Sequence, residues 1–351
     1  MKNNTFVYLL GSLFIGLLVG AIFFIASGYD PIGAYIAIFK GAFGSLPAVM
    51  LTLTQSTPLM FTGLAYAIAF KCGVINIGTE GQLYVGGFFA AIAGIYIQAP
   101  DYLILPICLL AAIIGGGVWA LIIAILKVRF SANEVISSIM LNSIAVGLCG
   151  YLLTEFFTEE GSWSSQSATI NVAAQLPRFD SRFQTSFAVV IAIVVCIFTQ
   201  IMLKRMVLGY EIRAIGQNKI AAETAGIKSG KIILFSMFLS GAIAGLGGAG
   251  QILGVDYRFV ENFSNGYGFD GVAVAALAYC NPIGVIFTSI LFGALRAGAM
   301  TLNRVAKIPM DFVTVIQAVI VVSVAAPLLV KQILEFIPNI IKRFGNVKEA
   351  K

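Results

Sequence analysis

Histidine is absent from this chain, and charged residues are scarce. None of the 351 residues is histidine, and charged side chains make up only 11% of the total. The absence of histidine removes the commonest metal ligand and proton shuttle. Soluble domains carry about 25% charged residues, so the low charge excludes an ordinary soluble protein.

A pairing pattern of cysteines is also missing. The five cysteines are scattered through apolar stretches: Cys72, Cys108, Cys149, Cys196 and Cys280. We interpret them as buried thiols that form neither a disulfide framework nor a zinc site. The net charge of +6 comes from basic residues that cluster in particular loops. Clustering of this kind is typical of a topology signal, so we expect no nucleic-acid partner.

The sequence does contain long apolar runs. Hydrophobic residues make up 59% of the chain and the mean hydropathy is +0.95. The runs are continuous rather than alternating, which favours spanning helices over a β-barrel. We predict an all-α polytopic membrane protein, with residues 1–351 forming one transmembrane domain. The ten predicted spans are 6–27, 46–70, 83–98, 103–126, 133–153, 186–203, 232–254, 267–280, 282–299 and 311–331.

Most of these spans are near the ~20 residues that a helix needs to cross a bilayer. Segments 83–98 and 267–280 are shorter and indicate broken helices. The first span resembles a signal peptide, but its apolar run is too long and no A-x-A cleavage site follows. We therefore predict a retained signal anchor.

Loop charges predict the orientation. The 204–231 loop is basic, with Lys204, Arg205, Arg213, Lys219, Lys228 and Lys231 against Glu211 and Glu223, and is expected in the cytoplasm. The 154–185 loop is acidic, with Glu155, Glu159, Glu160 and Asp180 against Arg178 and Arg182, and is expected outside. The basic C-terminal tail is expected in the cytoplasm. Ten crossings with both termini in the cytoplasm satisfy all three loops, although Arg304 and Lys307 then fall outside.

The basic loop contains LGYEIRAIGQNKIAAETAGIKSGK, residues 208–231. Asn218 can cap a helix that begins at Lys219, and Gly226 is suited to end it. Ala222 and Gly226 lie four apart, as do Ala221 and Ala225, which leaves a smooth face for a close partner backbone. The pattern alone leaves open an amphipathic helix on the membrane surface, with its lysines on anionic lipid.

Three stretches together carry a family resemblance. LGYEIRAIGQNKIAAETAGI with the following FSMFLSGAIAGLGGA, GVINIGTEGQLYVGGFFAA, and FDGVAVAALAYCNPIGVIFTSILFGALRAG occur between Gly73 and Gly298. The chain resembles ABC importer permeases of the subgroup that handles ribose, other simple sugars, nucleosides and branched-chain amino acids. The motif NIGTEGQ, residues 76–82, resembles the simple sugar and nucleoside branch of this subgroup. Length and the extra N-terminal span are similar to the larger of two paired nucleoside permeases.

The resemblance implies a permease subunit of an ATP-driven nucleoside importer in a bacterial cytoplasmic membrane. It implies that residues 204–231 form a cytoplasmic coupling loop that docks on an ATP-hydrolysing subunit, through Glu211, Arg213, Gly216, Asn218, Ala222 and Gly226. It further implies a second permease, giving a heterodimer with a homodimer left open, and an external substrate-binding lipoprotein. No catalytic residue or cofactor is expected in this chain, since ATP and magnesium belong to the partner.

The stretch GVINIGTEGQ, residues 73–82, predicts a break between two helices. Thr79 and Gln82 have the spacing of a capping box, so a helix is expected to start near Glu80. Glu80 then complements the positive helix end, or it lines a path together with Asn76 and Gln82. A carboxylate at membrane depth costs about 2.5–3.5 kcal/mol on insertion scales, which calls for a partner or a function.

A second break falls at NGYGFDG, residues 265–271. Asp270 lies at the start of the short helix and is either a cap at the outer surface or part of the path. Two breaks of this kind are typical of a substrate path at the middle of the membrane. Tyr267 and Phe269 are added to the predicted path because an aromatic ring can stack on a nucleobase or sugar face.

Several tempting motifs are excluded. GLGGAG, residues 245–250, lies in an apolar helix rather than after a strand, which favours helix packing over a dinucleotide site. GIKSGK, residues 226–231, lacks phosphate-loop spacing, so ATP would have to bind another polypeptide. Ser131 and Glu134 form another capping-box pattern with no chemistry assigned.

Other functions remain as alternatives. A simple sugar permease is the nearest one. An ion-coupled secondary transporter requires ionisable groups within the membrane, of which the only acidic candidates are Glu80 and Asp270, and it leaves the basic loop unexplained. An enzyme embedded in the membrane is disfavoured because no nucleophile, base and orienting group cluster in the sequence.

Overall fold

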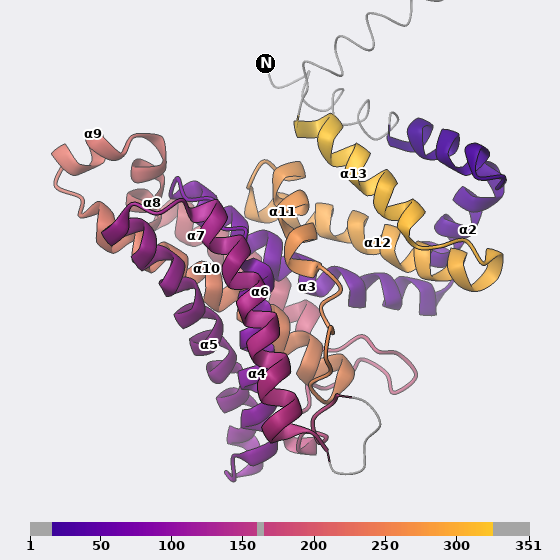
Figure 1. Cartoon of the computed structure of the whole chain (residues 1–351), viewed down its shortest axis with the longest axis horizontal. Helices are drawn as coiled ribbons and strands as arrows, with labels where there is room; N and C mark the ends of the chain where they lie inside the picture. Colours follow the sequence, from indigo (N-terminus) through magenta and orange to yellow (C-terminus); the bar gives the residue numbers. More distant parts are fainter. Residues whose placement is uncertain (1–15, 160–164, 326–351) are drawn as a thin grey trace, which may run out of the picture. The chain divides into compact units, whose positions relative to one another are not determined.

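The computed structural model describes residues 16–159 and 165–325, which divide into two compact units. Unit 2 runs from Ala42 to Ala294. Unit 1 consists of the residues before Ala42 together with the residues after Ala294. The described residues form helices with three isolated β-bridges and no strand. The all-α fold is therefore confirmed for them (Figure 1).

Most helices of unit 2 follow predicted spans. The helices of this unit are α3 (Leu46–Lys71), α4 (Thr79–Tyr96), α5 (Asp101–Phe130), α6 (Glu134–Leu152), α7 (Ala188–Arg205), α8 (Val207–Gln217), α9 (Lys219–Thr224), α10 (Ser229–Gln251), α11 (Tyr267–Leu277) and the first part of α12 (Pro282–Ala306). Two of them, α8 and α9, lie in the predicted 204–231 loop. Short π-helical ends extend α6 over Leu153–Phe157 and α10 over Ile252–Asp256, and Val172–Ala174 forms one 3-10 turn.

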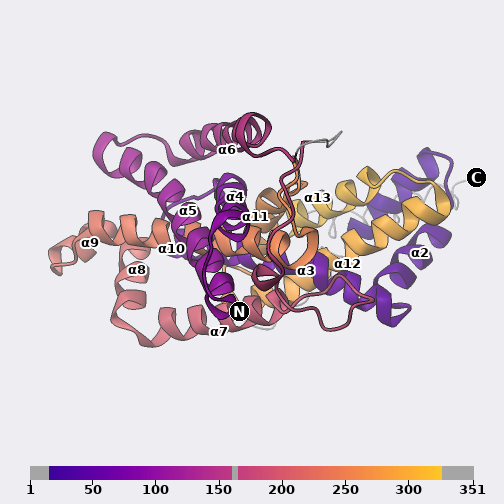
Figure 2. The same cartoon turned by 90° about the horizontal axis from the view of Figure 1, so that it is seen from below.

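Helix α10 is the centre of unit 2 because its glycines let neighbouring backbones approach it. A methyl group at Gly245 would overlap the carbonyl oxygen of Ala112 on α5, and one at Gly248 would overlap that of Leu83 on α4. Both glycines belong to GLGGAG, so the prediction that this motif serves helix packing is confirmed. About 67% of the apolar window of this span is buried inside the protein, against 22% for the span that contains α6. Helix α6 accordingly lies at the edge of the unit (Figure 2).

Unit 1 is built from a helix over Gly16–Ala26, α2 (Pro31–Phe43, of which the last residues enter unit 2), the end of α12 and α13 (Asp311–Ala325). Its buried cluster includes Phe24, whose ring stacks on Phe312 at a centroid distance of 5.7 Å. Helix α2 was not predicted. Its 13 residues are apolar but too short to span, and they adjoin a Pro at the first helical position.

Five described helices are long and apolar enough to cross a membrane, or six when α2 and α3 count as one broken span. Multiple apolar helices confirm a multi-pass membrane protein, while the number ten stays a prediction. Helix α4 has 18 residues, and most of them are buried by other helices of unit 2. Residues 6–15 of the predicted anchor and 326–331 of the last predicted span lie outside the described residues.

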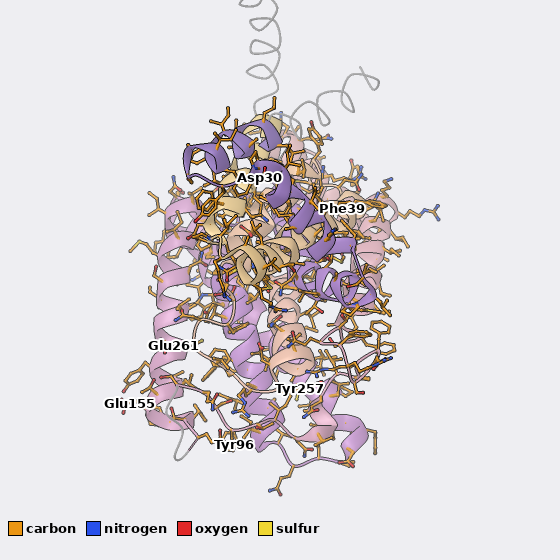
Figure 3. The ribbon with its side chains drawn as sticks, turned by 90° about the vertical axis from the view of Figure 1, so that its right-hand side faces the viewer. Asp30, Phe39, Tyr96, Glu155, Tyr257 and Glu261 are labelled. Carbon is orange, nitrogen blue, oxygen red and sulfur yellow. The ribbon has the colours of Figure 1, made fainter. Side chains whose placement is uncertain are left out.

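The two polar connections of unit 2 lie at opposite ends of that unit. Helices α8 and α9 are at one end and the connection of residues 165–187 is at the other (Figure 1). Tyr96, Glu155 and Tyr257 are close to this second end (Figure 3). Here Arg178 lies over the Tyr257 ring at 4.4 Å from its centroid, and Arg182 pairs with Asp180 at 2.6 Å. Hydrogen bonds from Arg182 lower the pKa of the Asp180 carboxyl to about 2.

Candidate functional site

The first predicted break is the α3–α4 connection, residues 72–78. Gly73 has a φ of +76°, a conformation that favours glycine, and α4 begins at Thr79. The predicted helix start is thus correct, but the capping box is wrong. Gly78 precedes the helix with no side-chain cap, because Thr79 donates to Gly268 on α11 and Gln82 pairs with Asn76.

A buried amide pair holds this connection. Asn76 Nδ2 donates to Gln82 Oε1 at 3.0 Å, and Gln82 Nε2 donates back to Asn76 Oδ1 at 3.1 Å. Asn76 Nδ2 also donates to Ser240 Oγ on α10 at 2.8 Å. Both amide side chains are fully buried. Asn76 and Gln82, which we predicted as path residues, therefore brace the start of α4.

The two predicted breaks meet. Gly266, with a φ of +83°, precedes α11, and the Gly268 N–H donates to Glu80 Oε2 at 2.5 Å. Thr79 Oγ1 donates to the Gly268 carbonyl at 3.0 Å. A methyl group at Gly268 would overlap the backbone of Glu80, so glycine permits this approach. We call the contact between the first turns of α4 and α11 the helix junction.

The helix junction explains how a carboxylate is tolerated there. Glu80 is 6% exposed and lies in the first turn of α4, while its acceptor oxygen faces the first turn of α11. Each helix start carries partial positive charge on unsatisfied N–H groups. Two such ends converge on one side chain, which offsets part of the cost of burying it.

The other predicted path residues of α11 have different surroundings. Tyr267 is buried, and its hydroxyl donates to Gln55 Oε1 at 2.6 Å. Phe269 is 49% exposed, and Asp270 is partly exposed in the first turn of the helix. Of these three, Phe269 borders the pocket described next.

A pocket of about 720 Å³ opens beside the helix junction. Its lining combines a carboxylate, amides, hydroxyls and aromatic rings from α4, α6, the turn before α11 and α11 itself: Glu80, Tyr84, Asn142, Ser143, Val146, Gly147, Asn262, Asn265, Gly266 and Phe269. These groups can accept and donate hydrogen bonds to hydroxyls and present rings to a flat ligand. Glu80 thus bonds to the start of α11 and also lines the pocket, while its place in a substrate path stays a prediction.

Asn142 is a site residue that sequence reasoning missed. Its Oδ1 accepts from the Gly81 N–H at 2.9 Å, and its Nδ2 donates to the Ile77 carbonyl at 2.9 Å. The side chain therefore ties α6 to the end of the α3–α4 connection and to the first turn of α4, and it also lines the pocket. An amide in the middle of an apolar helix was the available signal, because polar groups at membrane depth need partners.

The predicted coupling loop contains two short helices, α8 and α9, and the second begins at Lys219 as expected. Asn218 Oδ1 accepts from the Ala221 N–H at 3.0 Å and caps α9. Gly226 follows the helix with a φ of +87°, and the Ile227 N–H donates to the Ala222 carbonyl at 3.0 Å. The predicted cap and stop are confirmed. We call residues 204–231 the coupling segment after the role predicted for it, which stays a prediction.

The six predicted coupling residues are not equivalent. Glu211 and Arg213 are partly exposed, and Asn218 and Gly226 are exposed. Ala222 is 4% exposed and packs in the apolar cluster with Ile212 and Ile233, so its side chain faces this chain's own core. A methyl group at Gly216 would overlap the Lys71 carbonyl oxygen, so this glycine serves a contact within the chain.

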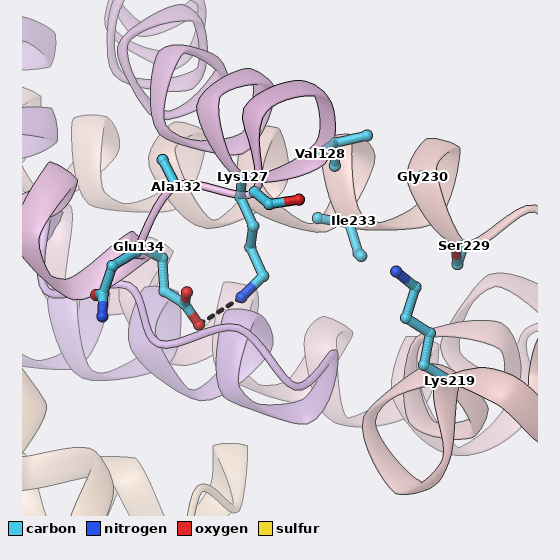
Figure 4. A pocket seen from close by; sticks show the side chains of 10 residues that line it. Lys127, Val128, Ala132, Glu134, Lys219, Ser229, Gly230 and Ile233 are labelled. Carbon is cyan, nitrogen blue, oxygen red and sulfur yellow. Dashed lines mark ion pairs between the residues drawn. The ribbon is translucent and has the colours of Figure 1, made fainter.

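A second pocket, of about 580 Å³, adjoins the coupling segment (Figure 4). Lys127 and Glu134 on its wall form an ion pair of 2.5 Å, and Lys219 points toward it from α9. Asn133 caps α6 by accepting from the Val135 and Ile136 N–H groups, while Ser131 ends α5 with a φ of 51°. The capping box predicted for Ser131 and Glu134 is therefore wrong, because Asn133 lies closer to the helix start.

Within residues 16–159 and 165–325, no three His, Cys, Asp or Glu side chains are grouped for metal binding. The five cysteines are buried free thiols, as predicted.

Comparisons with known proteins identify the family. The family described as "Branched-chain amino acid transport system / permease component" matches residues 48–325. The chain is 35% identical over 319 residues to the guanosine ABC transporter permease protein NupP of Bacillus subtilis, covering 90% of this chain and 91% of NupP. It is 31% identical over 347 residues to the nucleoside ABC transporter permease protein NupB of Lactococcus lactis, covering 95% of each.

A third relative is the glucose ABC transporter permease protein TsgB13 of Haloferax volcanii, 30% identical over 315 residues that cover 87% of this chain and 83% of TsgB13. The family match covers most of the chain and agrees with the three sequence stretches on which the resemblance was based. The chain therefore belongs to the family of branched-chain amino acid transport system permease components.

Proposed function

We propose that this chain is the membrane subunit of an ATP-driven ABC importer and that its substrate is a nucleoside. The names of two relatives, NupP and NupB, support this substrate class. The single observation that carries the proposal is the helix junction, where Glu80 faces a polar and aromatic pocket. Broken helices with buried polar ends are typical of substrate sites in transporters.

The pocket offers complementary chemistry for a nucleoside. Glu80 accepts hydrogen bonds from ribose hydroxyls, since a carboxylate is an acceptor with two oxygens. Asn142 and Asn265 both carry amide groups that can donate and accept. Phe269, which is 49% exposed, presents a ring on which a base can stack. The other predicted path residues are proposed to support the pocket without lining it: Asn76, Gln82, Tyr267 and Asp270.

The coupling segment is proposed to dock on a separate subunit that binds ATP and magnesium. Glu211 and Arg213, which are partly exposed, and the exposed Asn218 supply polar contacts, and Ala222 keeps α9 seated on the rest of unit 2. The substrate would arrive on an external lipoprotein that contacts the acidic 154–185 connection. A second permease of the same family would complete the path, most simply as a heterodimer.

The proposed topology has ten crossings in a bacterial cytoplasmic membrane, with both termini and the coupling segment inside. Opposite placement of the two polar connections of unit 2 supports it, as do the basic residues of the coupling segment.

The test is uptake of radiolabelled nucleoside in cells that lack this gene, with the gene restored on a plasmid. We expect the plasmid to restore uptake. Excess unlabelled nucleoside should reduce this uptake, and excess glucose should not. Restored uptake of glucose alone would support the second candidate, a sugar permease, which the similarity to TsgB13 favours. Uptake that persists without the ATPase subunit, and follows an ion gradient, would contradict an ABC importer.

A further inference from the structure

The coupling segment approaches the α3–α4 connection backbone to backbone at Gly216, beside an apolar cluster in which Ile212 and Ile215 pack with Cys72 and Val74. A methyl group at Gly216 would overlap the Lys71 carbonyl oxygen and would lie 3.2 Å from the Gly73 nitrogen. In the other direction, a methyl group at Gly73 would lie 3.3 Å from the Gly216 Cα. Two glycines thus face each other where α8 ends and where α3 has just ended. No flexible side chain lies between these backbones to absorb a displacement.

This contact is connected to the helix junction by the short stretch of chain from Gly73 to Glu80. Asn76 follows Gly73 by three residues and is fixed to Gln82 and to Ser240. Asn142 then ties Ile77 and Gly81 to α6. The segment from Gly73 to Gly81 is therefore held at several points, so it moves as a piece rather than as a loose loop. At its far end, Glu80 bonds to Gly268.

We propose that Gly216 is a positioning residue through which movement of the coupling segment reaches Glu80. The inference rests on the proposed coupling function and adds the route within this chain. Displacement of α8 pushes or releases the backbone at Lys71 and Gly73. That shift turns the start of α4, and it strengthens or breaks the bond between Glu80 and Gly268. Substrate contact at the pocket thereby changes with the state of the ATPase subunit.

Simple helix packing is the competing explanation, and α8 contains a matched control for it. Gly209 lies in the same helix, and a methyl group there would overlap the Met202 carbonyl oxygen and the Leu203 Cα. That contact is with the end of α7 and does not involve the α3–α4 connection. Gly209→Ala therefore imposes a similar packing strain on α8 without reaching Glu80 directly.

A native reporter also lies at the contact. Cys72 is 1% exposed and sits between Lys71 and Gly73. Replacing Cys108, Cys149, Cys196 and Cys280 by alanine leaves it as the only thiol of this chain. The experiment uses the complex purified with its ATPase subunit and reconstituted in vesicles. The labelling rate of Cys72 by a small membrane-permeant maleimide is measured without nucleotide and with ATP plus vanadate.

We expect the labelling rate of Cys72 to change at least threefold with nucleotide in the parent and in Gly209→Ala. In Gly216→Ala the change disappears, and nucleoside uptake falls at least tenfold while ATP hydrolysis continues. Nucleotide-dependent labelling together with normal uptake in Gly216→Ala would overturn the inference.

The parent provides a test that does not depend on the folding of any Gly216 variant. If its ATPase subunit is bound but Cys72 labelling is the same with and without nucleotide, the route is wrong while the coupling function stands. If the purified chain binds no ATPase subunit at all, the proposed function itself fails, and the route fails with it. These outcomes are separated by whether the two subunits purify together.

Discussion

At the scale of single residues, Glu80 is the side chain with the most demanding surroundings. It is almost fully buried, accepts from the Gly268 N–H and borders the pocket. A hydrogen bond to a charged group contributes about 1.5–3 kcal/mol, against about 0.5–1.5 kcal/mol for a neutral pair. Removing the charge while keeping the shape should therefore weaken the helix junction without emptying the site.

We predict that Glu80→Gln lowers nucleoside uptake at least tenfold while the amount of protein in the membrane stays within twofold. Asp101→Asn, which removes an exposed carboxylate from the first turn of α5, is the matched control and should keep normal uptake. Radiolabelled uptake and immunoblotting of membranes measure both effects. A parallel loss of uptake and of protein amount in Glu80→Gln would mean that the residue only stabilises the fold.

Asn142 belongs to the same scale because one side chain satisfies two backbone groups. Asn142→Leu leaves the Gly81 N–H and the Ile77 carbonyl without that partner. A buried group that loses its partner costs about 1–3 kcal/mol, so we predict a lower thermal unfolding midpoint in detergent. Ser143→Ala, at the next and exposed position on the pocket wall, should leave the midpoint unchanged.

The residue scale also separates what local sequence can predict from what it cannot. The Asn218 cap and the Gly226 stop were predicted correctly because cap and helix are adjacent in the chain. The capping box at Thr79 failed because Gly268, 189 residues away, accepts its hydroxyl. Asn142 was missed for the same reason, since its partners are on a different helix. Local rules therefore succeeded at Asn218 and Gly226, where the partner is adjacent in the chain, and failed at Thr79, where the partner is distant.

At the scale of elements, close packing of α10 on α5 depends on residues without side chains. Gly241 and Gly245 each approach the backbone of α5 so closely that a methyl group would overlap a carbonyl oxygen. Overpacking in a well-packed interior costs about 1–3 kcal/mol. The sequence shows the spacing of small residues along α10. It does not show which helices, α5 and α4, pack against those residues.

We predict that Gly245→Ala destabilises the protein by about 1–3 kcal/mol, by analogy with overpacked cores. Gly147→Ala is the control, because Gly147 lies within α6 and no atom lies within 4 Å of the added methyl group. That change should be neutral or slightly stabilising, by up to about 1 kcal/mol, since alanine favours helix. Equilibrium unfolding in mixed detergent micelles measures the two variants together. Equal changes in the free energy of unfolding of the two variants would show that helix propensity, rather than packing, determines the effect of the added methyl group.

At the scale of the whole molecule, the sequence located the two breaks but not every helix. The predicted short segments became α4 and α11, whose first turns meet, as the pattern of two breaks implied. Helix α2 escaped prediction because 13 apolar residues are fewer than a span requires and its apolar run is interrupted at Lys40. Apolar runs therefore locate crossing helices well, but they do not reveal short helices that pack beside them.

Topology is the property of the whole molecule that all proposed roles require. The basic coupling segment should face the cytoplasm because positive loops are retained there. In a chain with its five cysteines replaced by alanine, Ile220→Cys and Val172→Cys each introduce one thiol at positions that are 75% and 79% exposed. We predict that a membrane-impermeant maleimide added to intact cells labels Val172→Cys at least tenfold faster than Ile220→Cys.

Inverted membrane vesicles from the same cells should give the opposite result, because the other face is then outside. The two variants control each other, since both thiols are similarly exposed and differ only in the end of unit 2 on which they lie. Labelling of Ile220→Cys from outside intact cells would place α9 away from any cytoplasmic ATPase. The coupling function would then fail, and with it the route through Gly216, whereas the helix junction and its pocket would remain available to a transporter driven by other means.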